Sequence, residues 1–259
     1  MKVVIFAGGL GTRISEETDI RPKPMVEIGG KPILWHIMKI YAHYGYNDFI
    51  ICLGYKGYVI KEYFMNYFLH NSDITIDLAN NQMEVLGTKS DNFKVTLVDT
   101  GLNTKTAGRL QQVRKYLGNE DFMLTYGDGI SNIDINKLVK FHQQHKKIAT
   151  VSAIQMEARF GGMEINEQGD VHAFREKAKD EGKWINGGFF VLSPKIFDYF
   201  DKDMRDTMWE DEPLEKLTAN NQLVAYQHKG FWKCMDALRD KIELEELWSK
   251  NNAAWKIWK

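Results

Sequence analysis

Hydrophobic positions along the chain alternate between short apolar runs and helical spacing. The runs KVVIFA (2–7) and DFIICLGY (48–55) predict buried strands, and the segment 32–45 between them places apolar residues at helical spacing. The alternation continues with candidate strands at 74–79, 94–101, 121–129 and 148–154 and candidate helices at 56–68, 107–116 and 135–145. Strands that alternate with helices are typical of βαβ units, so we predict a mainly parallel sheet with helices on both faces.

The pattern changes in residues 160–193, where short alternating runs are separated by glycine turns. This segment predicts a small hairpin-rich β insert beside the parallel sheet. Helical spacing then returns at 195–200, 212–219 and 237–248, with a further candidate strand at 223–229. The predicted fold class is α/β, with one doubly wound, mainly parallel (Rossmann-like) mixed sheet in a single domain over residues 1–259.

The composition narrows the classes of function. Lys and Arg number 34 against 35 Asp and Glu, so the net charge of −1 predicts no basic face for nucleic acid or anionic lipid. The sequence opens on a strand-like run without a secretory signal, and no apolar run is long enough to span a bilayer. Cys52 and Cys234 match no metal spacing, and we expect both to be free packing residues in a reducing compartment. We therefore expect a cytoplasmic protein with no nucleic-acid or membrane partner.

A glycine-rich loop directly follows the first predicted strand. Gly8, Gly9 and Gly11 lie where open α/β sheets bind ligands, and their N–H groups can surround an anion. The loop lacks the Lys-Ser/Thr pair of a Walker A motif, and Ile14 stands where a dinucleotide fingerprint needs its third glycine. A tight turn without a ligand is the alternative that the glycines alone leave open.

Charged residues favour a polyphosphate site over a bare turn. Arg13 and the proline-flanked Lys23 lie within one loop of the glycines, and two fixed cations beside exposed amides suit a polyphosphate. Such a site also needs a metal, for which Asp128 in TYGDG and Asp236 in FWKCMDALRD are candidates. On the residues alone, a turn role for Asp128 and a helix N-cap role for Asp236 are at least as well supported.

Other clusters of residues indicate packing or solvent exposure. His142 and His145 lie three residues apart on a predicted helix without further metal ligands, so we expect both to be solvated. Trp209 and Trp232 are expected in the core or an interface. The tail AAWKIWK is expected to pack on the body or on a neighbouring subunit.

Taken together, these motifs resemble those of the sugar-1-phosphate nucleotidyltransferases. AGGLGTR followed by RPKPMVEIGGKPIL is similar to that family's glycine loop and proline-flanked lysine. GYKGYVIKEYF, TYGDG, INGGFFVL and FWKCMDALRDK resemble the glucose-1-phosphate cytidylyltransferase branch, and the resemblance covers nearly the whole chain. It implies Mg²⁺-dependent transfer of a cytidylyl group from CTP to α-D-glucose 1-phosphate, giving CDP-glucose and pyrophosphate for O-antigen or other polysaccharide biosynthesis. It further implies a homo-oligomer, with a nucleotide-binding half at roughly 1–130 and a sugar-phosphate-binding half at roughly 131–259.

The resemblance also implies roles for single residues. The expected nucleotide-binding residues are Ala7, Gly8, Gly9, Gly11, Thr12, Arg13, Lys23, Thr104, Arg109 and Asp128. The expected sugar-phosphate-binding residues are Glu176, Lys177, Asn186 and Gly187, and the expected metal ligands are Asp128 and Asp236. Arg13, Lys23, Asp128 and Lys177 are the expected catalytic residues. The attacking sugar phosphate is already an anion, so these residues need only position two polyanions and neutralise charge.

Two positions depart from the family pattern. Ala178 replaces the proline that follows Lys177, which keeps the charges and bears on loop rigidity and sugar preference. Ala107 replaces a glycine in TAGRL and would be strained if its φ were positive. By the same resemblance, the TAGRL segment around Arg109 favours CTP over dTTP or UTP. Without the resemblance, Arg109 would be a plausible exposed residue near the start of a helix.

Three alternative functions stay open at this point. The first keeps the reaction but uses another sugar 1-phosphate or base. The second is a sensor that binds a nucleotide or sugar phosphate without catalysis, against which the joint presence of Asp128, Asp236, Lys23 and Lys177 counts. The third is a dinucleotide-dependent oxidoreductase, which Ile14 weakens.

Overall fold

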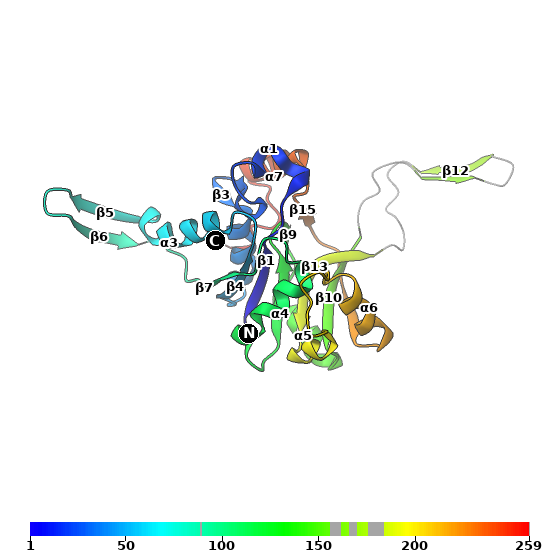
Figure 1. Ribbon diagram of the computed structural model, residues 1–259. Coiled ribbons are helices and arrows are strands. Elements are labelled where there is room, and N and C mark those ends of the chain that lie inside the picture. The colour runs from blue at the N-terminus through cyan, green and yellow to red at the C-terminus, as the bar shows by residue number, and fades with distance from the viewer. Residues whose placement is uncertain (89, 156–161, 166–169, 176–183, 259) are drawn as a thin grey trace.

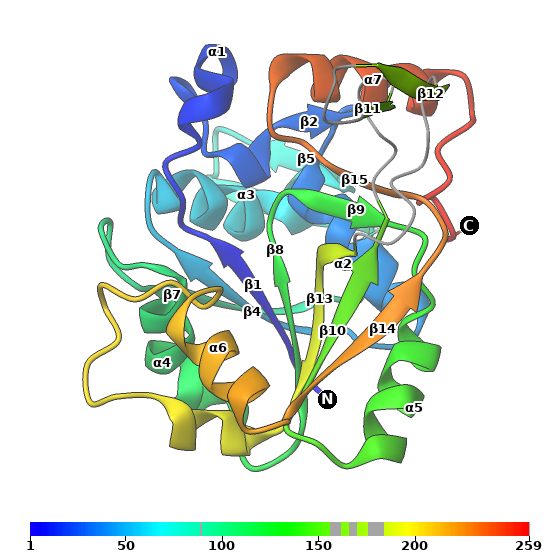
Figure 2. The ribbon, with the colours of Figure 1, turned by 90° about the vertical axis from the view of Figure 1, so that its right-hand side faces the viewer.

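Among the described residues, a seven-stranded sheet forms the centre of the protein. The computed structural model describes residues 1–88, 90–155, 162–165, 170–175 and 184–258. The strands of the sheet are β1 (Val3–Ala7), β4 (Asp48–Leu53), β7 (Lys94–Asp99), β8 (Phe122–Tyr126), β10 (Ala149–Ile154), β13 (Ile185–Leu192) and β14 (Leu223–His228). They are ordered β14-β10-β13-β8-β1-β4-β7, and within this sheet β13 alone runs antiparallel to its neighbours (Figure 2). The predicted α/β class with a mainly parallel sheet is confirmed.

Helices cover both faces of this sheet. They are α2 (Ile33–His43), α3 (Gly57–His70), α4 (Thr106–Leu117), α5 (Ile135–His145), α6 (Glu212–Ala219), α7 (Leu238–Ser249) and the short α1 (Ser15–Thr18). Val3 and Ile5 of β1 pack in one core with α2, α5 and α7, whereas Val4 and Phe6 pack in a second core with α4 and α6. A strand buried on both faces is apolar at every position, which explains the uninterrupted run that β1 shows in the sequence.

Small two-stranded sheets flank the central one. They pair β2 (Glu27–Ile28) with β3 (Lys31–Pro32), β5 (Ser72–Asp77) with β6 (Gln82–Thr88), β9 (Gly129–Ser131) with β15 (Trp232–Cys234), and β11 (Gly162–Ile165) with β12 (Val171–Arg175). The β11–β12 pair is a hairpin within the predicted β insert. The strand expected at 74–79 lies in the β5–β6 hairpin, which projects from the body of the molecule (Figure 1) instead of joining the central sheet.

Some local expectations differ from the structure. The helix expected at 195–200 is a 3₁₀ helix, η3 (Pro194–Tyr199). His142 is buried on the inner face of α5, and both His142 and His145 hydrogen-bond to Thr150 Oγ1, at 2.8 and 2.7 Å. The expectation of solvation was therefore wrong for His142, whereas His145 is half-exposed. Ala107 lies inside α4 and is not among the residues with positive φ, so it carries no such strain.

The aromatic tail packs on the body of the protein, as expected. Trp255 is fully buried, and its Nε1 lies 3.4 Å from Nδ1 of His36. The second ring nitrogen of His36 lies 2.8 Å from the Ile28 carbonyl oxygen, and burial lowers the pKa of His36 to about 4. Trp209 is also fully buried, as expected for a core residue.

None of the helices in the described residues combines the length and the apolar character that crossing a bilayer would require.

Candidate active site

The glycine loop lies at the carboxyl end of β1, at the predicted edge of the sheet. β1 ends at Ala7 between the parallel strands β4 and β8, so the carboxyl ends of three strands meet there (Figure 2). Gly9 and Thr12 are exposed, and Gly11 adopts a φ of 67°. The 3₁₀ helix η1 (Thr12–Ile14) begins at the next residue. The exposed backbone of this turn is available to a ligand, and the side chain of Arg13 lies outside the described part of the chain.

A buried arginine lies directly beneath this loop. Arg109 of α4 is only 4% exposed. Its guanidinium donates to Leu53 O (2.9 Å), Thr100 Oγ1 (2.7 Å), Gly8 O (3.0 Å) and Leu102 O (3.3 Å). A Cβ atom at Gly8 would lie 2.2 Å from Arg109 Nη1, so this position needs glycine. Arg109 is therefore not an exposed residue near the start of a helix. Its guanidinium holds the glycine loop from below through Gly8. Its contact with a nucleotide stays a prediction.

Three charged residues far apart in the sequence meet beside the loop. Lys23 begins the 3₁₀ helix η2 (Lys23–Met25), and its Nζ lies 2.7 Å from Asp128 Oδ2 and 2.7 Å from Asp236 Oδ1. Partial burial disfavours the ammonium, but the charges and hydrogen bonds of the two carboxylates outweigh it and raise the pKa of Lys23. Lys23 and Asp128 come from the predicted nucleotide-binding half and Asp236 from the other. The lysine and both candidate metal ligands therefore share one site.

Strand pairing between β9 and β15 brings the two aspartates together. Asp128 lies between β8 and β9, and the Met235 N–H donates to its carbonyl oxygen at 2.9 Å. The N–H groups of Asp236 and Ala237 both donate to Asp240 Oδ2, at 3.0 and 2.8 Å. Ala237 is the N-cap of α7, so Asp236 is not the N-cap that the sequence allowed, and its carboxylate reaches the lysine instead.

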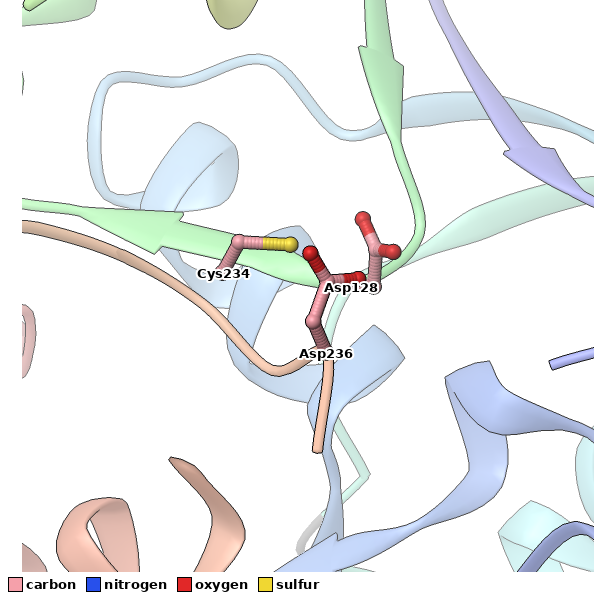
Figure 3. Close-up of side chains that lie close together, drawn as sticks. All are labelled: Asp128, Cys234 and Asp236. Atoms are coloured by element: carbon pink, nitrogen blue, oxygen red, sulfur yellow. The ribbon is translucent and has the colours of Figure 1, made fainter. Parts of the chain in front are cut away.

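A cysteine thiol lies beside these carboxylates. Figure 3 shows Cys234 at the end of β15 with its sulfur directed toward Asp236 and Asp128, and one ligand atom from each of the three residues lies within 4.8 Å of the others. Burial and the neighbouring carboxylates raise the pKa of the thiol. Both cysteines are free, as expected, with Cys52 buried and Cys234 half-buried. The place of Cys234 beside the two carboxylates was not part of the prediction. Cys234 and Asp236 are two residues apart, and such residues in an extended segment point to the same side.

The donor atoms of this cluster suit a divalent cation. Carboxylate oxygens are the ligands that Mg²⁺ prefers, and Mg²⁺ is commonly held by one or two protein carboxylates together with phosphate oxygens. The thiol adds a soft donor that favours Zn²⁺ or Cd²⁺ over Mg²⁺. Asp128 and Asp236 would therefore suit Mg²⁺, and the Cys234 thiol would lie close enough to contact an ion held there.

The remaining predicted residues lie around this centre or outside the described residues. Thr104 is half-buried just before α4, and Asn186 is exposed at the start of β13. The carbonyl oxygen of the neighbouring Gly187 accepts a hydrogen bond from Trp232 Nε1 at 2.7 Å. The predicted sugar-phosphate residues Glu176 and Lys177, together with Ala178, lie outside the described residues.

Comparison with known proteins decides the family. The family model for nucleotidyl transferases matches residues 2–249. The chain belongs to the nucleotidyl transferase family. This nucleotidyl transferase is 55% identical to the glucose-1-phosphate cytidylyltransferase of Salmonella typhi over the full length of both chains. It is also 47% identical to the probable glucose-1-phosphate cytidylyltransferase of Bacillus subtilis, again over both full lengths.

Solved structures share the fold of this nucleotidyl transferase. HddC from Yersinia pseudotuberculosis has a TM-score of 0.70 and 25% identity, and the match covers 95% of this chain and 99% of HddC. A putative glucose-1-phosphate thymidylyltransferase from Bacillus anthracis has a TM-score of 0.71 and 18% identity, with coverage of 100% and 98%. The second match shows a common fold alone.

Proposed function

We propose that the protein transfers a cytidylyl group from CTP to α-D-glucose 1-phosphate, giving CDP-glucose and pyrophosphate. The observation that carries the proposal is the meeting of Lys23, Asp128 and Asp236 beside the glycine loop. The relatives in Salmonella typhi and Bacillus subtilis, which carry this activity in their names, support the choice of base and sugar. A product used in polysaccharide biosynthesis stays a prediction.

For this reaction the protein must position the two substrates and neutralise the charge of their phosphates, and it needs no general acid or base. The sugar phosphate oxygen attacks the α-phosphorus in line while pyrophosphate leaves. The attacking oxygen is already an anion, so no side chain has to act as a nucleophile. The amides of the glycine loop from Gly8 to Thr12 would bind the triphosphate, and Lys23 would neutralise charge on the departing pyrophosphate. Asn186 would bind the sugar. Asp128 and Asp236 would hold Mg²⁺, which when bound neutralises charge on the phosphates.

Pyrophosphate release tests the proposal. Purified protein is assayed with Mg²⁺ and α-glucose 1-phosphate against CTP, UTP, dTTP, ATP and GTP in turn, with Asp128→Asn as the control. We expect release with CTP alone and its loss in the variant. Release with another nucleotide would refute the base preference, and release only with other sugar 1-phosphates would refute the sugar. No release with any pair would overturn the enzymatic proposal in favour of a sensor.

A homo-oligomer is the second part of the proposal, and the β5–β6 hairpin supports it. The hairpin exposes large apolar side chains, with Ile76 55%, Leu78 88% and Leu86 62% exposed. A cavity of about 410 Å³ lies at its base, lined chiefly by α3 and the segment that follows the hairpin. Exposed apolar side chains that gather on one projecting element are typical of protein–protein contact surfaces. The aromatic side chains of Phe64, Phe68 and Phe93 line part of this cavity. We propose that they receive the apolar tip of another copy, in a head-to-tail contact between identical chains.

Light scattering on a sizing column tests this contact. We expect the wild-type protein to elute as an oligomer and Leu78→Lys to elute as a smaller species. Ile20→Lys is the matched control, because Ile20 is 72% exposed but lies far from the hairpin in the sequence. An oligomer that survives Leu78→Lys would place the interface elsewhere. The two free cysteines suit a cytoplasmic location, which we propose on that ground.

A further inference from the structure

A carboxylate that the sequence did not single out connects elements on both sides of the site. Glu210 lies just before α6, and the Tyr126 hydroxyl donates to its Oε1. Thr106, the first residue of α4, donates from Oγ1 to Glu210 Oε2 at 2.9 Å. Both oxygens of one side chain are therefore engaged by neutral hydroxyl donors. Thr106 follows the predicted base-reading residue Thr104 by two positions, and Tyr126 precedes Asp128 by two.

The Tyr126 hydroxyl extends this connection to the predicted sugar site. Asn186 Nδ2 donates to Tyr126 Oη at 3.4 Å, while Asn186 Oδ1 accepts from the Gly188 N–H at 2.8 Å. Gly188 has a φ of 80°, and a Cβ there would lie 2.7 Å from Tyr126 Cδ2, so the tyrosine ring packs closely against β13. The asparagine amide is thus held at both of its ends.

The Glu210 carboxylate fixes which group donates and which accepts in each hydrogen bond of this chain. An ionised carboxylate can only accept, so Glu210 requires Tyr126 to donate its hydroxyl hydrogen. The tyrosine oxygen then offers lone pairs alone, and these accept from the Asn186 NH₂ group. If the Asn186 amide were flipped by 180°, its oxygen would face the tyrosine oxygen and its NH₂ group would face the Gly188 N–H, so neither hydrogen bond could form.

We propose that Glu210 is a positioning residue for sugar recognition, which acts through Tyr126 to fix the orientation of the Asn186 amide. Asn186 is exposed, and its NH₂ group has a second N–H beyond the one given to Tyr126. That donor meets a hydroxyl of the bound sugar 1-phosphate. The proposal rests on the proposed function, because it takes a sugar 1-phosphate as the ligand of this half.

Substrate-specific kinetics separate this role from a purely structural one. KM and kcat are measured for glucose 1-phosphate and for CTP in wild type, Glu210→Gln and Tyr126→Phe. We expect each variant to raise KM for glucose 1-phosphate about tenfold, as for loss of one hydrogen bond, with KM for CTP unchanged. Glu215→Gln is the matched control, because Glu215 is an exposed carboxylate on α6. The double variant should be no worse than either single one.

Calorimetry with glucose 1-phosphate provides a readout that does not depend on turnover. Binding to wild type and about tenfold weaker binding to both variants, at unchanged melting temperature, would support the proposal. Equal losses for CTP and glucose 1-phosphate, or unchanged affinity in a folded variant, would overturn it. Absence of binding to wild type would overturn it as well. Failure of pyrophosphate release in wild type that still binds the sugar phosphate would instead refute the proposed function alone.

Discussion

Replacing Lys23 with methionine is expected to strengthen metal binding and to abolish turnover. The Lys23 ammonium lies 2.7 Å from an oxygen of Asp128 and 2.7 Å from an oxygen of Asp236, in the place a divalent cation would take. A cation that binds these carboxylates must displace the ammonium or withstand its repulsion. Methionine keeps an unbranched stem of similar length, so the substitution removes the charge with little change in packing.

The size of this effect follows from charge and exposure. Two unit charges about 4 Å apart interact by about 4 kcal/mol near a protein surface and by about 1 kcal/mol in bulk water. The Lys23 side chain is 13% exposed, while those of Asp128 and Asp236 are 25% and 42% exposed, so the site lies between these limits. We expect loss of the ammonium to favour cation binding by about 2 kcal/mol, or about 30-fold in Kd.

Titration with Mn²⁺, followed by the electron paramagnetic resonance signal of the free ion, measures this affinity without nucleotide. Lys39→Met is the matched control, because Lys39 lies 2.7 Å from Asp91 and the two side chains are 19% and 18% exposed. We expect tighter binding in Lys23→Met alone, together with loss of pyrophosphate release. If Lys23→Met bound Mn²⁺ no more tightly than wild type, the idea that the ammonium competes for the cation site would be refuted.

Three further predictions concern a buried histidine, the site cysteine and the buried arginine. The pKa of His36 is about 4 in the folded protein and about 6.5 in an unfolded chain, so stability is lost as pH falls through this window. The free energy of unfolding should drop by about 2 kcal/mol between pH 7 and pH 5 in urea titrations, and an equal slope in His36→Gln would contradict this. Cd²⁺ should inhibit wild type at about tenfold lower concentration than Cys234→Ser, whereas equal inhibition would exclude the sulfur from the metal's ligands. Arg109→Lys should lower the free energy of unfolding by about 2–4 kcal/mol in thermal melts, because lysine cannot satisfy four oxygen acceptors, and an unchanged Tm would count against the reasoning.

Local patterns in the sequence were sufficient to predict most of the fold. The doubly buried run in β1 and the helical spacing over 135–145 each depend on residues close together in the chain, and both segments form the predicted elements. The strand expected at 74–79 has the same local character but pairs in a projecting hairpin. Its partner and position depend on tertiary contacts, which periodicity does not encode.

The residues of the candidate site also fall into two groups, those marked by local motifs and those placed by long-range contacts. Lys23 and Asp128 were found because motifs with glycine and proline mark them, and Asp236 because a motif resembles a family pattern. The position of Cys234 depends on the pairing of β15 with β9, two segments about a hundred residues apart. Glu210 carries no motif and is defined only by what Tyr126 and Thr106 donate to it. Roles that arise from long-range contacts are therefore the ones that the sequence left hidden.

We expect the position of Lys23 to couple nucleotide binding to metal binding. Its ammonium neutralises the two carboxylates, which would otherwise repel each other. A triphosphate on the glycine loop offers Lys23 new anionic partners, and the lysine lies within one loop of the glycines. Movement of the ammonium toward the phosphates would free Asp128 and Asp236 to hold a cation. The two ligands should therefore bind cooperatively, because each removes a charge that opposes the other.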